Sequence, residues 1–166
     1  MSKTKYALVG VGGRSRFFYN ALVDTYASTS ELVAFCDINQ KRMDYANKQI
    51  QTKFGGPIVN TYYYTEFETM IKKERPDIVI VTTIDRTHHH YITRAMELGC
   101  DVITEKPMTI DAPKCQQILD TVKKTGRELK VAFNYRYAPH NTKIRELIMD
   151  DTIGDVTSLH FEWLLE

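Results

Sequence analysis

The sequence lacks most features that would place it outside ordinary globular proteins. It has only three cysteines, Cys36, Cys100 and Cys115, and no Cys-x-x-Cys pair. Three widely spaced cysteines form no disulfide framework, and this pattern is typical of a reducing compartment. The formal net charge is only +1 at pH 7, which gives no argument for nucleic acid or an anionic membrane as partner. Because it also has no signal-peptide core and no apolar run of bilayer-spanning length, we expect a cytoplasmic protein.

Short apolar runs alternate with longer helical patterns along most of the chain. Runs of strand length occupy residues 6–9, 32–36, 58–63, 78–81, 102–104 and 129–133. Helical spacing fills the intervals at residues 17–26, 40–53, 67–71, 89–98 and 112–124, and Gly99 and Gly126 follow the last two of these. Strands that alternate with helices of crossover length predict a parallel sheet covered on both faces. The predicted fold class is therefore α/β, with a doubly wound parallel sheet of the Rossmann type.

The end of the chain follows a different pattern. A short helix is predicted over residues 142–149, and Gly154 and Asp155 then turn the chain into residues 157–165, where apolar and polar side chains alternate. A period of two is typical of a strand with one face covered. We therefore expect residues 1–138 to form the Rossmann domain. Residues 139–166 are expected to form a linker helix and the first strand of an incomplete C-terminal α/β substrate domain.

A glycine-rich loop, Gly10-Val11-Gly12-Gly13-Arg14-Ser15, lies between the first predicted strand and the first predicted helix. This is the context that a dinucleotide-binding fingerprint requires. Gly10 permits a tight turn, Gly12 lets the backbone approach a pyrophosphate, and Ser15 is a small residue in the place of the third glycine. Free N–H groups at the helix start would then face the phosphates. Taken alone, the loop is also compatible with a strand–helix turn that binds nothing.

Asp37 ends the second predicted strand, where the ribose-binding acid of a dinucleotide site belongs. A carboxylate there accepts hydrogen bonds from the ribose hydroxyls and would repel the 2′-phosphate of NADP. The next residue, Ile38, is not a phosphate-binding arginine, although Lys41 and Arg42 are near enough to keep NADP open. Asp37 could also cap the helix that starts near Gln40, and both roles can coexist. The expected cofactor is NAD, with NADP as the less favoured alternative.

Polar residues also follow the fourth predicted strand, in the segment from Thr82 to His88. Segments that leave the carboxyl ends of parallel strands line the ligand crevice, so these side chains are placed to hydrogen-bond a cofactor. The triplet His88-His89-His90 invites a metal-binding interpretation. However, consecutive helical residues point about 100° apart and cannot share one ion, and no Asp, Glu or Cys lies at ligand spacing. We expect no metal site.

Glu105, Lys106 and Pro107 follow the fifth predicted strand and therefore lie on the same edge of the sheet. A lysine held in a partly desolvated cleft can hydrogen-bond a hydroxyl or carbonyl group, or donate or accept a proton. Glu105 could orient that lysine. From spacing alone, a surface ion pair between the two side chains is an equally good interpretation.

Together these motifs resemble the Gfo/Idh/MocA family, the relatives of glucose-fructose oxidoreductase and inositol dehydrogenase. Residues 131–139 also resemble the segment that joins the two domains of that family. The resemblance implies that Lys106 is the active-site lysine near the nicotinamide and the substrate hydroxyl. It implies a cofactor crevice that includes Thr83, Asp85, His88 and Glu105, and substrate contacts from Tyr135 and Arg136. The sequence departs from the family pattern at Ile84, where a proline is common, and at Ser15.

The resemblance implies an NAD-dependent oxidoreductase that transfers a hydride between nicotinamide and a sugar, cyclitol or related polyol, with Lys106 assisting proton transfer. Family members complete their active site with a C-terminal domain, so we expect this chain to bind dinucleotide but to be inactive alone. The full-length protein is expected to act on a small sugar-like molecule as a homo-oligomer. Two alternatives stay open: an NAD-dependent glycoside-cleaving enzyme that uses transient oxidation and elimination, and a non-catalytic dinucleotide-binding module.

Overall fold

The structure is a computed structural model that describes residues 2–164. The chain folds into two compact units, Met1–Ala132 and Phe133–Glu166. The strands of the first unit are β1 (Thr4–Val9), β2 (Ser30–Asp37), β3 (Asn60–Tyr63), β4 (Ile78–Val81), β5 (Asp101–Glu105) and β6 (Leu129–Ala132). Its helices are α1 (Ser15–Val23), α2 (Gln40–Phe54), α3 (Phe67–Glu74), α4 (His88–Glu97) and α5 (Ala112–Thr125), with short 3₁₀ turns η1 (Tyr64–Glu66) and η2 (Asp85–Thr87). Within residues 2–164, no helix has both the length and the apolar character needed to cross a membrane.

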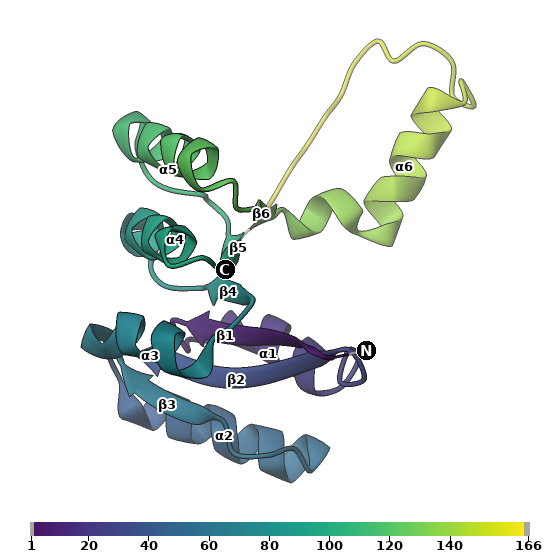
Figure 1. Cartoon of the computed structure of the whole chain (residues 1–166). Coiled ribbons are helices and arrows are strands. Elements are labelled where there is room, and N and C mark those ends of the chain that lie inside the picture. The colour runs from purple at the N-terminus through teal and green to yellow at the C-terminus, as the bar shows by residue number, and fades with distance from the viewer. Residues whose placement is uncertain (1, 165–166) are drawn as a thin grey trace. The chain divides into compact units, whose positions relative to one another are not determined.

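The six strands form one parallel sheet in the order β3-β2-β1-β4-β5-β6 (Figure 1). The chain winds outward from β1 in one direction to β3, then crosses back to β4 and winds the other way. This confirms the predicted doubly wound fold. The order reverses between β1 and β4, and a parallel sheet of this type binds its ligands beyond the carboxyl ends of the strands at that point.

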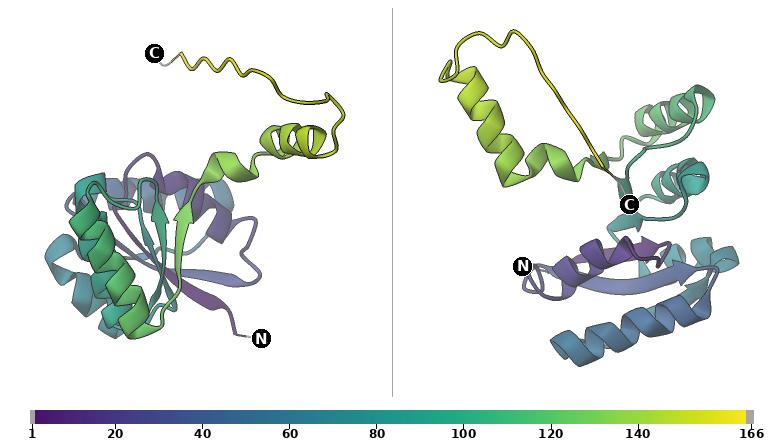
Figure 2. Two further views of the ribbon diagram at one scale, coloured as in Figure 1. Left: turned by 90° about the horizontal axis from the view of Figure 1, so that it is seen from above. Right: turned by 180° about the vertical axis from the view of Figure 1, so that it is seen from behind.

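Each central strand sends alternate side chains into two separate cores, one on either face of the sheet. Ala7, Val9, Val79 and Val81 pack with residues of α3, α4 and α5. Leu8 and Ile80, which lie between these residues in sequence, and Phe35 on β2 point the other way and pack with residues of α1 and α2. Figure 2 shows the helices on both sides of the sheet. Burial on both faces explains why these strands are near-continuous apolar runs.

The helix ends agree with most of the sequence pattern and differ from it at one place. Gly126 caps α5 in the left-handed conformation, at φ 67°, and Gly99 follows α4 at φ 93°. The first helix was predicted to continue to Tyr26, but α1 ends at Val23, and the N–H of Tyr26 bonds to the carbonyl of Ala21 in a turn. Residues 25–29 include three Ser or Thr residues, whose hydroxyls compete for backbone hydrogen bonds and favour turns over helix.

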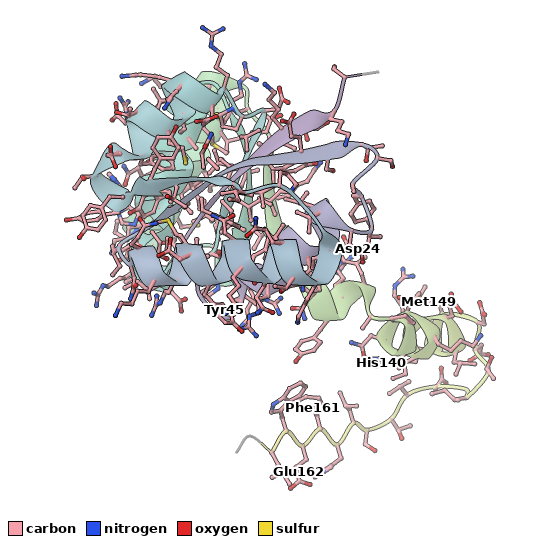
Figure 3. All side chains as sticks on the ribbon, turned by 90° about the horizontal axis from the view of Figure 1, so that it is seen from below. Asp24, Tyr45, His140, Met149, Phe161 and Glu162 are labelled. Carbon is pink, nitrogen blue, oxygen red and sulfur yellow. The ribbon has the colours of Figure 1, made fainter. Side chains whose placement is uncertain are left out.

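The second unit contains η3 (Asn134–Tyr137) and α6 (Pro139–Met149), which covers the helix predicted over residues 142–149. The structure assigns no strand to residues 155–164. Figure 3 shows Phe161 and Glu162 on opposite sides of this segment, which agrees with the predicted alternation. A strand requires a hydrogen-bonded partner strand, and Leu165 lies outside the described residues. The strand over residues 157–165 and the second domain that it would open therefore stay predictions.

Candidate functional site

A cavity of about 470 Å³ lies beyond the carboxyl ends of β1, β2 and β4, at the point where the strand order reverses. We call it the crevice cavity. Its lining combines residues from the ends of these strands, from the loops after them and from η1, η2, α2 and α4: Val9, Gly10, Gly12, Gly13, Arg14, Cys36, Asp37, Ile38, Arg42, Tyr64, Thr82, Thr83, Ile84, Arg86, Thr87 and Tyr91. The topology therefore brings three motifs that are far apart in sequence into one site.

The glycine loop has two kinds of glycine. Gly10 has φ +89°, and a Cβ there would lie 2.5 Å from the backbone nitrogen of Thr83, so a side chain is excluded by the neighbouring strand end. At Gly12 and Gly13 a Cβ would meet no atom within 4 Å. No side chain or neighbouring atom therefore covers the backbone at these two glycines. A pyrophosphate can bind to backbone N–H groups only where it can come this close to them.

Ser15 begins α1 and supports the loop from within the protein. Its side chain is fully buried, and its hydroxyl donates a 2.6 Å hydrogen bond to the carbonyl of Gly12. No side chain caps this end of α1. In the described part of the chain, no hydrogen bond is recorded from the N–H groups of Gly12, Gly13 or Arg14. Unpaired N–H groups at a helix start are the donors that bind phosphate.

Asp37 connects the end of β2 to the glycine loop. One carboxylate oxygen accepts from the N–H of Val11 at 2.5 Å, and the other accepts from the N–H of Asn39 at 2.8 Å. The cap of α2 is Asn39, whose side chain accepts from the N–H of Lys41, so Asp37 does not occupy the capping position considered above. A carboxylate offers about four acceptor positions. Asp37 thus keeps acceptor capacity for a ribose hydroxyl in the cavity that it lines.

Cys36 and Tyr91 line the crevice cavity without contributing a reactive group. Burial raises the pKa of the Cys36 thiol to about 12, and the negative charges of Asp37 and Glu66 add to this effect. Burial likewise raises the pKa of Tyr91. Both side chains are therefore protonated and neutral near pH 7. A thiol needs a lowered pKa to act as a nucleophile, so Cys36 acts as an apolar wall.

His88 is fully buried between the loops that follow β4 and β5. Its Nδ1 lies 2.8 Å from the carbonyl oxygen of Pro107, and its Nε2 lies 3.0 Å from that of Thr83. A neutral ring donates to one of these carbonyls and a protonated ring to both. His88 therefore connects Thr83, in the crevice, to the segment that contains Lys106.

Replacing His88 by phenylalanine should lower the free energy of unfolding by about 1–3 kcal/mol, because the ring can no longer donate to the carbonyls of Thr83 and Pro107. Phenylalanine fills a volume similar to that of histidine, so the loss in free energy of unfolding measures the lost hydrogen bonds rather than a new cavity. The measurement is urea denaturation followed by circular dichroism. His90→Phe, at an exposed position on the same helix, is the matched control and should leave stability unchanged. Equal stability of His88→Phe and the wild type would contradict a bridging role.

Glu105, at the end of β5, has a different partner from the one considered in the sequence. Glu105 is 5% exposed, and its carboxylate accepts from Nε of Arg14, on the glycine loop, at 2.6 Å. Its second oxygen accepts from the backbone N–H of Lys106 at 3.2 Å. The carboxylate therefore holds the backbone of Lys106, and no ion pair with the Lys106 side chain is recorded in residues 2–164.

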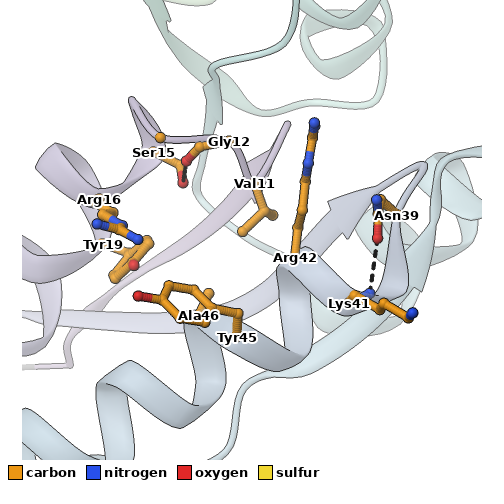
Figure 4. Close-up of a pocket in the computed structure, with 11 residues that line it drawn as sticks. Val11, Gly12, Ser15, Arg16, Tyr19, Asn39, Lys41, Arg42, Tyr45 and Ala46 are labelled. Atoms are coloured by element: carbon orange, nitrogen blue, oxygen red, sulfur yellow. Dashed lines mark hydrogen bonds between the residues drawn. The ribbon is translucent and has the colours of Figure 1, made fainter.

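A second hollow, of about 290 Å³, lies beside the glycine loop between α1 and α2. Figure 4 shows Arg42 and Tyr45 extending from α2, with Arg16 and Tyr19 opposite them on α1. Lys41 also lines the hollow, and its lining contains no acidic residue. Gly12, Gly13 and Arg42 are shared with the crevice cavity. The positive charge of this hollow therefore lies next to the position expected for the adenosine ribose.

The structure brings together many, but not all, of the residues expected in the site. The crevice cavity is lined by Gly10, Gly12, Gly13, Arg14, Asp37 and Thr83, with Ser15, His88 and Glu105 buried behind the loops. Asp85 and Lys106 are exposed and do not line the crevice cavity. Tyr135 and Arg136 lie on η3 in the second unit. No group of three His, Cys, Asp or Glu side chains suited to a metal ion occurs among the described residues.

Several lining residues were not assigned from the sequence. Tyr64 follows the short strand β3, and Tyr91 lies one helical turn into α4. Neither belongs to a motif, and only the order of the strands shows that the loop after β3 reaches the cavity. Arg86 adds a positive charge from η2. The sequence could have indicated these residues only by their position, since each of them follows the carboxyl end of a strand.

The strand order, the bare glycine loop and the carboxylate at the end of β2 define a dinucleotide-binding Rossmann domain. Comparison with known families gives the particular group. The family described as "Oxidoreductase family, NAD-binding Rossmann fold", GFO_IDH_MocA, matches residues 4–133. The chain belongs to this family, as the motifs predicted.

Individual relatives are similar over nearly all of this chain but are longer. The chain is 34% identical to YteT of Bacillus subtilis over 149 residues, covering 90% of this chain and 34% of YteT. It is 28% identical to inositol 2-dehydrogenase/D-chiro-inositol 3-dehydrogenase of Lactiplantibacillus plantarum, covering 91% and 41% of the two chains. A more distant relative is glycosyl hydrolase family 109 protein 2 of Akkermansia muciniphila, 23% identical over 98% of this chain and 34% of that protein.

Solved structures confirm the fold. Scyllo-inositol dehydrogenase of Lactobacillus casei, with bound NAD(H) and scyllo-inositol, superposes with a TM-score of 0.79 at 19% identity, covering 94% of this chain and 44% of that chain. The chain thus spans between about a third and a half of the length of these relatives.

Proposed function

We propose that this chain provides the NAD site of an oxidoreductase that transfers a hydride between nicotinamide and a sugar, cyclitol or related polyol. The observation that carries the proposal is the crevice cavity, where the bare backbone of Gly12 and Gly13 faces the same space as Asp37. The relatives named as inositol dehydrogenases support the choice of substrate class. D-glucoside 3-dehydrogenase of Escherichia coli, 29% identical over 126 residues, adds to that support.

The residues present fit a dinucleotide. The loop from Gly10 to Ser15 would hold the pyrophosphate through its free N–H groups and the start of α1. Asp37 would accept from the ribose hydroxyls, and Ile38 and Ile84, which are 64% and 56% exposed, would provide apolar walls for the adenine ring. When bound, NAD supplies the group that accepts or gives the hydride. The protein supplies binding, orientation and proton transfer.

The remaining assigned residues would act around the reacting carbon. Lys106 would hold or move the proton of the substrate hydroxyl. Glu105 and His88 would fix the backbone on either side of Lys106, through the contacts to its N–H and to the carbonyl of Pro107. Thr83 would line the cofactor side, Asp85 would approach the cofactor from outside the crevice cavity, and Tyr135 and Arg136 would approach the substrate. The whole protein is proposed to work on a small molecule as a homo-oligomer.

Calorimetric titration of the chain with NAD, NADP and ADP-ribose tests the binding part of the proposal. We expect saturable 1:1 binding of NAD and ADP-ribose, and failure of all three to bind would exclude the proposal. The chemistry is tested on the whole protein by NADH absorbance with a panel of inositols and D-glucosides. Steady NADH formation distinguishes a dehydrogenase from the second candidate, a glycoside-cleaving enzyme, which makes no net NADH. The observation that favours this second candidate is the similarity to the glycosyl hydrolase family 109 protein.

Replacing Asp37 by asparagine should weaken NAD binding by about 10- to 150-fold, because a hydrogen bond to a charged acceptor contributes about 1.5–3 kcal/mol. NADP should be affected less, because its 2′-phosphate no longer meets a carboxylate and can use the positive charge of Arg16, Lys41 and Arg42. The measurement is the ratio of the two dissociation constants at one ionic strength.

Asp44→Asn is the matched control, because Asp44 lies on the exposed side of α2 and accepts from Gln40. It should change neither affinity. An unchanged ratio of NAD to NADP affinity in Asp37→Asn would exclude Asp37 as the ribose ligand. The ratio is informative even if the variant is less stable, because both cofactors bind the same folded state.

A further inference from the structure

The ion pair between Arg14 and Glu105 crosses the end of the sheet. Arg14 lies in the loop after β1 and Glu105 ends β5, and β4 lies between these two strands. The partners are 91 positions apart in sequence. Glu105 is 5% exposed, whereas the Arg14 side chain is 40% exposed. Burying a carboxylate without a partner destabilises the folded protein, so the ion pair with Arg14 offsets the cost of burying Glu105.

The Arg14 guanidinium is fixed on two sides and open on the others. Its Nε donates to Glu105 at 2.6 Å, and its central carbon lies 4.9 Å from the ring centroid of Phe17. Arginine carries five N–H donors. Among the described residues, no hydrogen bond is recorded from its two terminal amino groups, and Arg14 lines the crevice cavity beside Gly12 and Gly13. A planar, fixed fork of donors is well suited to phosphate oxygens.

We propose that the Arg14 side chain binds the pyrophosphate of the dinucleotide and is positioned for this by Glu105. The same carboxylate accepts from the backbone N–H of Lys106 through its other oxygen. The phosphate-binding group and the loop of the proposed catalytic lysine are therefore attached to one buried carboxylate. This inference rests on the proposed function, since it requires a dinucleotide in the crevice cavity.

The charges give the proposal a specific signature. With Arg14 present, the charge of Glu105 is neutralised and the carboxylate serves as an anchor. Without Arg14, the buried carboxylate would face a doubly negative pyrophosphate in a low-dielectric site and repel it. Removing the charge of Glu105 should therefore weaken binding in the wild type and strengthen binding when Arg14 is absent.

The test is calorimetric titration of the wild type, Arg14→Gln, Glu105→Gln and the double variant with two probes, ADP-ribose and adenosine. Arg14→Gln should bind ADP-ribose about tenfold more weakly, as expected for the loss of a charge-assisted hydrogen bond, and should bind adenosine as the wild type does. Glu105→Gln alone should weaken ADP-ribose binding about threefold, and in the Arg14→Gln background it should strengthen it by a similar factor. Arg14→Lys, which keeps the charge and loses the fork, should lie between the wild type and Arg14→Gln.

Arg127→Gln is the matched control, because Arg127 is exposed and precedes β6 at the other end of the sheet; it should bind both probes unchanged. Melting temperatures of all variants show that the folded state is being titrated. Equal ADP-ribose affinity in Arg14→Gln and the wild type would overturn the inference. The inference would also be overturned if Arg14→Gln weakened the binding of adenosine and of ADP-ribose equally. It would be overturned as well if Glu105→Gln changed ADP-ribose affinity in the same direction in both backgrounds. If the wild type bound no ADP-ribose, the proposed function itself would fail. That result is distinct from ADP-ribose binding that is the same in the wild type and in Arg14→Gln.

Discussion

Replacing Gly10 by alanine should destabilise the chain by about 2–5 kcal/mol, while the same change at Gly12 should leave it folded. At Gly10 the backbone has φ +89°, which costs about 1–2 kcal/mol for a residue with a Cβ. That Cβ would also lie 2.5 Å from the nitrogen of Thr83 and 2.7 Å from the carbonyl of Thr82, and these backbone atoms directly follow the central strand β4 and cannot move away without a large cost. Urea denaturation of the two variants measures this difference.

Gly12→Ala is both the control for stability and a test of the cofactor site. Its Cβ would meet no atom of the protein, so the free energy of unfolding should change by less than about 1 kcal/mol. The methyl group would, however, occupy the space through which a pyrophosphate reaches the loop. ADP-ribose should then bind about tenfold or more weakly, because hydrogen bonds to the phosphates are lost.

Two results would contradict this account of the loop. If Gly12→Ala bound ADP-ribose like the wild type, the phosphates would not approach Gly12. If Gly10→Ala were as stable as the wild type, the contact between the ends of β1 and β4 would be looser than the structure has it. The two glycines thus separate a requirement of the fold from a requirement of the ligand, within one motif.

The fold could be predicted because its signals are local. The buried strand Ile78–Val81 is a continuous apolar run, and Gly126 ends α5 in the conformation that glycine favours. The alternation of such runs with helices fixes the doubly wound class. The exact end of α1 was predicted less well, because Tyr26 continues the apolar spacing although the chain has already turned at Asp24. Periodicity records which side chains are apolar and does not record which backbone groups are bonded.

The candidate site was predictable as a set of loops but not as a set of contacts. The sequence predicts that Asp37 and Glu105 lie at the same edge of the sheet, because parallel strands share their carboxyl ends. It does not predict that Glu105 pairs with Arg14, because partners 91 positions apart are brought together only by the strand order. For the same reason, the contact of His88 with the Pro107 carbonyl has no sequence signal.

Replacing Lys106 by alanine in the whole protein should lower kcat by about 10²–10⁴-fold, the usual contribution of a general acid or base. The dissociation constant for NAD should stay nearly unchanged, because Lys106 is exposed and does not line the crevice cavity. Turnover is followed by NADH absorbance with an inositol or D-glucoside that the wild type oxidises, and NAD binding is followed by calorimetry. Lys123→Ala, at an exposed position on α5, is the matched control and should alter neither value.

Lys106→Arg separates the two roles that a lysine at this position can have. Arginine keeps the positive charge but does not release its proton at any pH at which the protein is folded. If Lys106 transfers the hydroxyl proton, Lys106→Arg should be nearly as slow as Lys106→Ala. Recovery of most of the activity by arginine would show that the charge alone suffices, and unchanged turnover in both variants would remove Lys106 from the mechanism. Because Glu105 and His88 hold the backbone around Lys106 rather than its amine, neither substitution should disturb the contacts that position the loop.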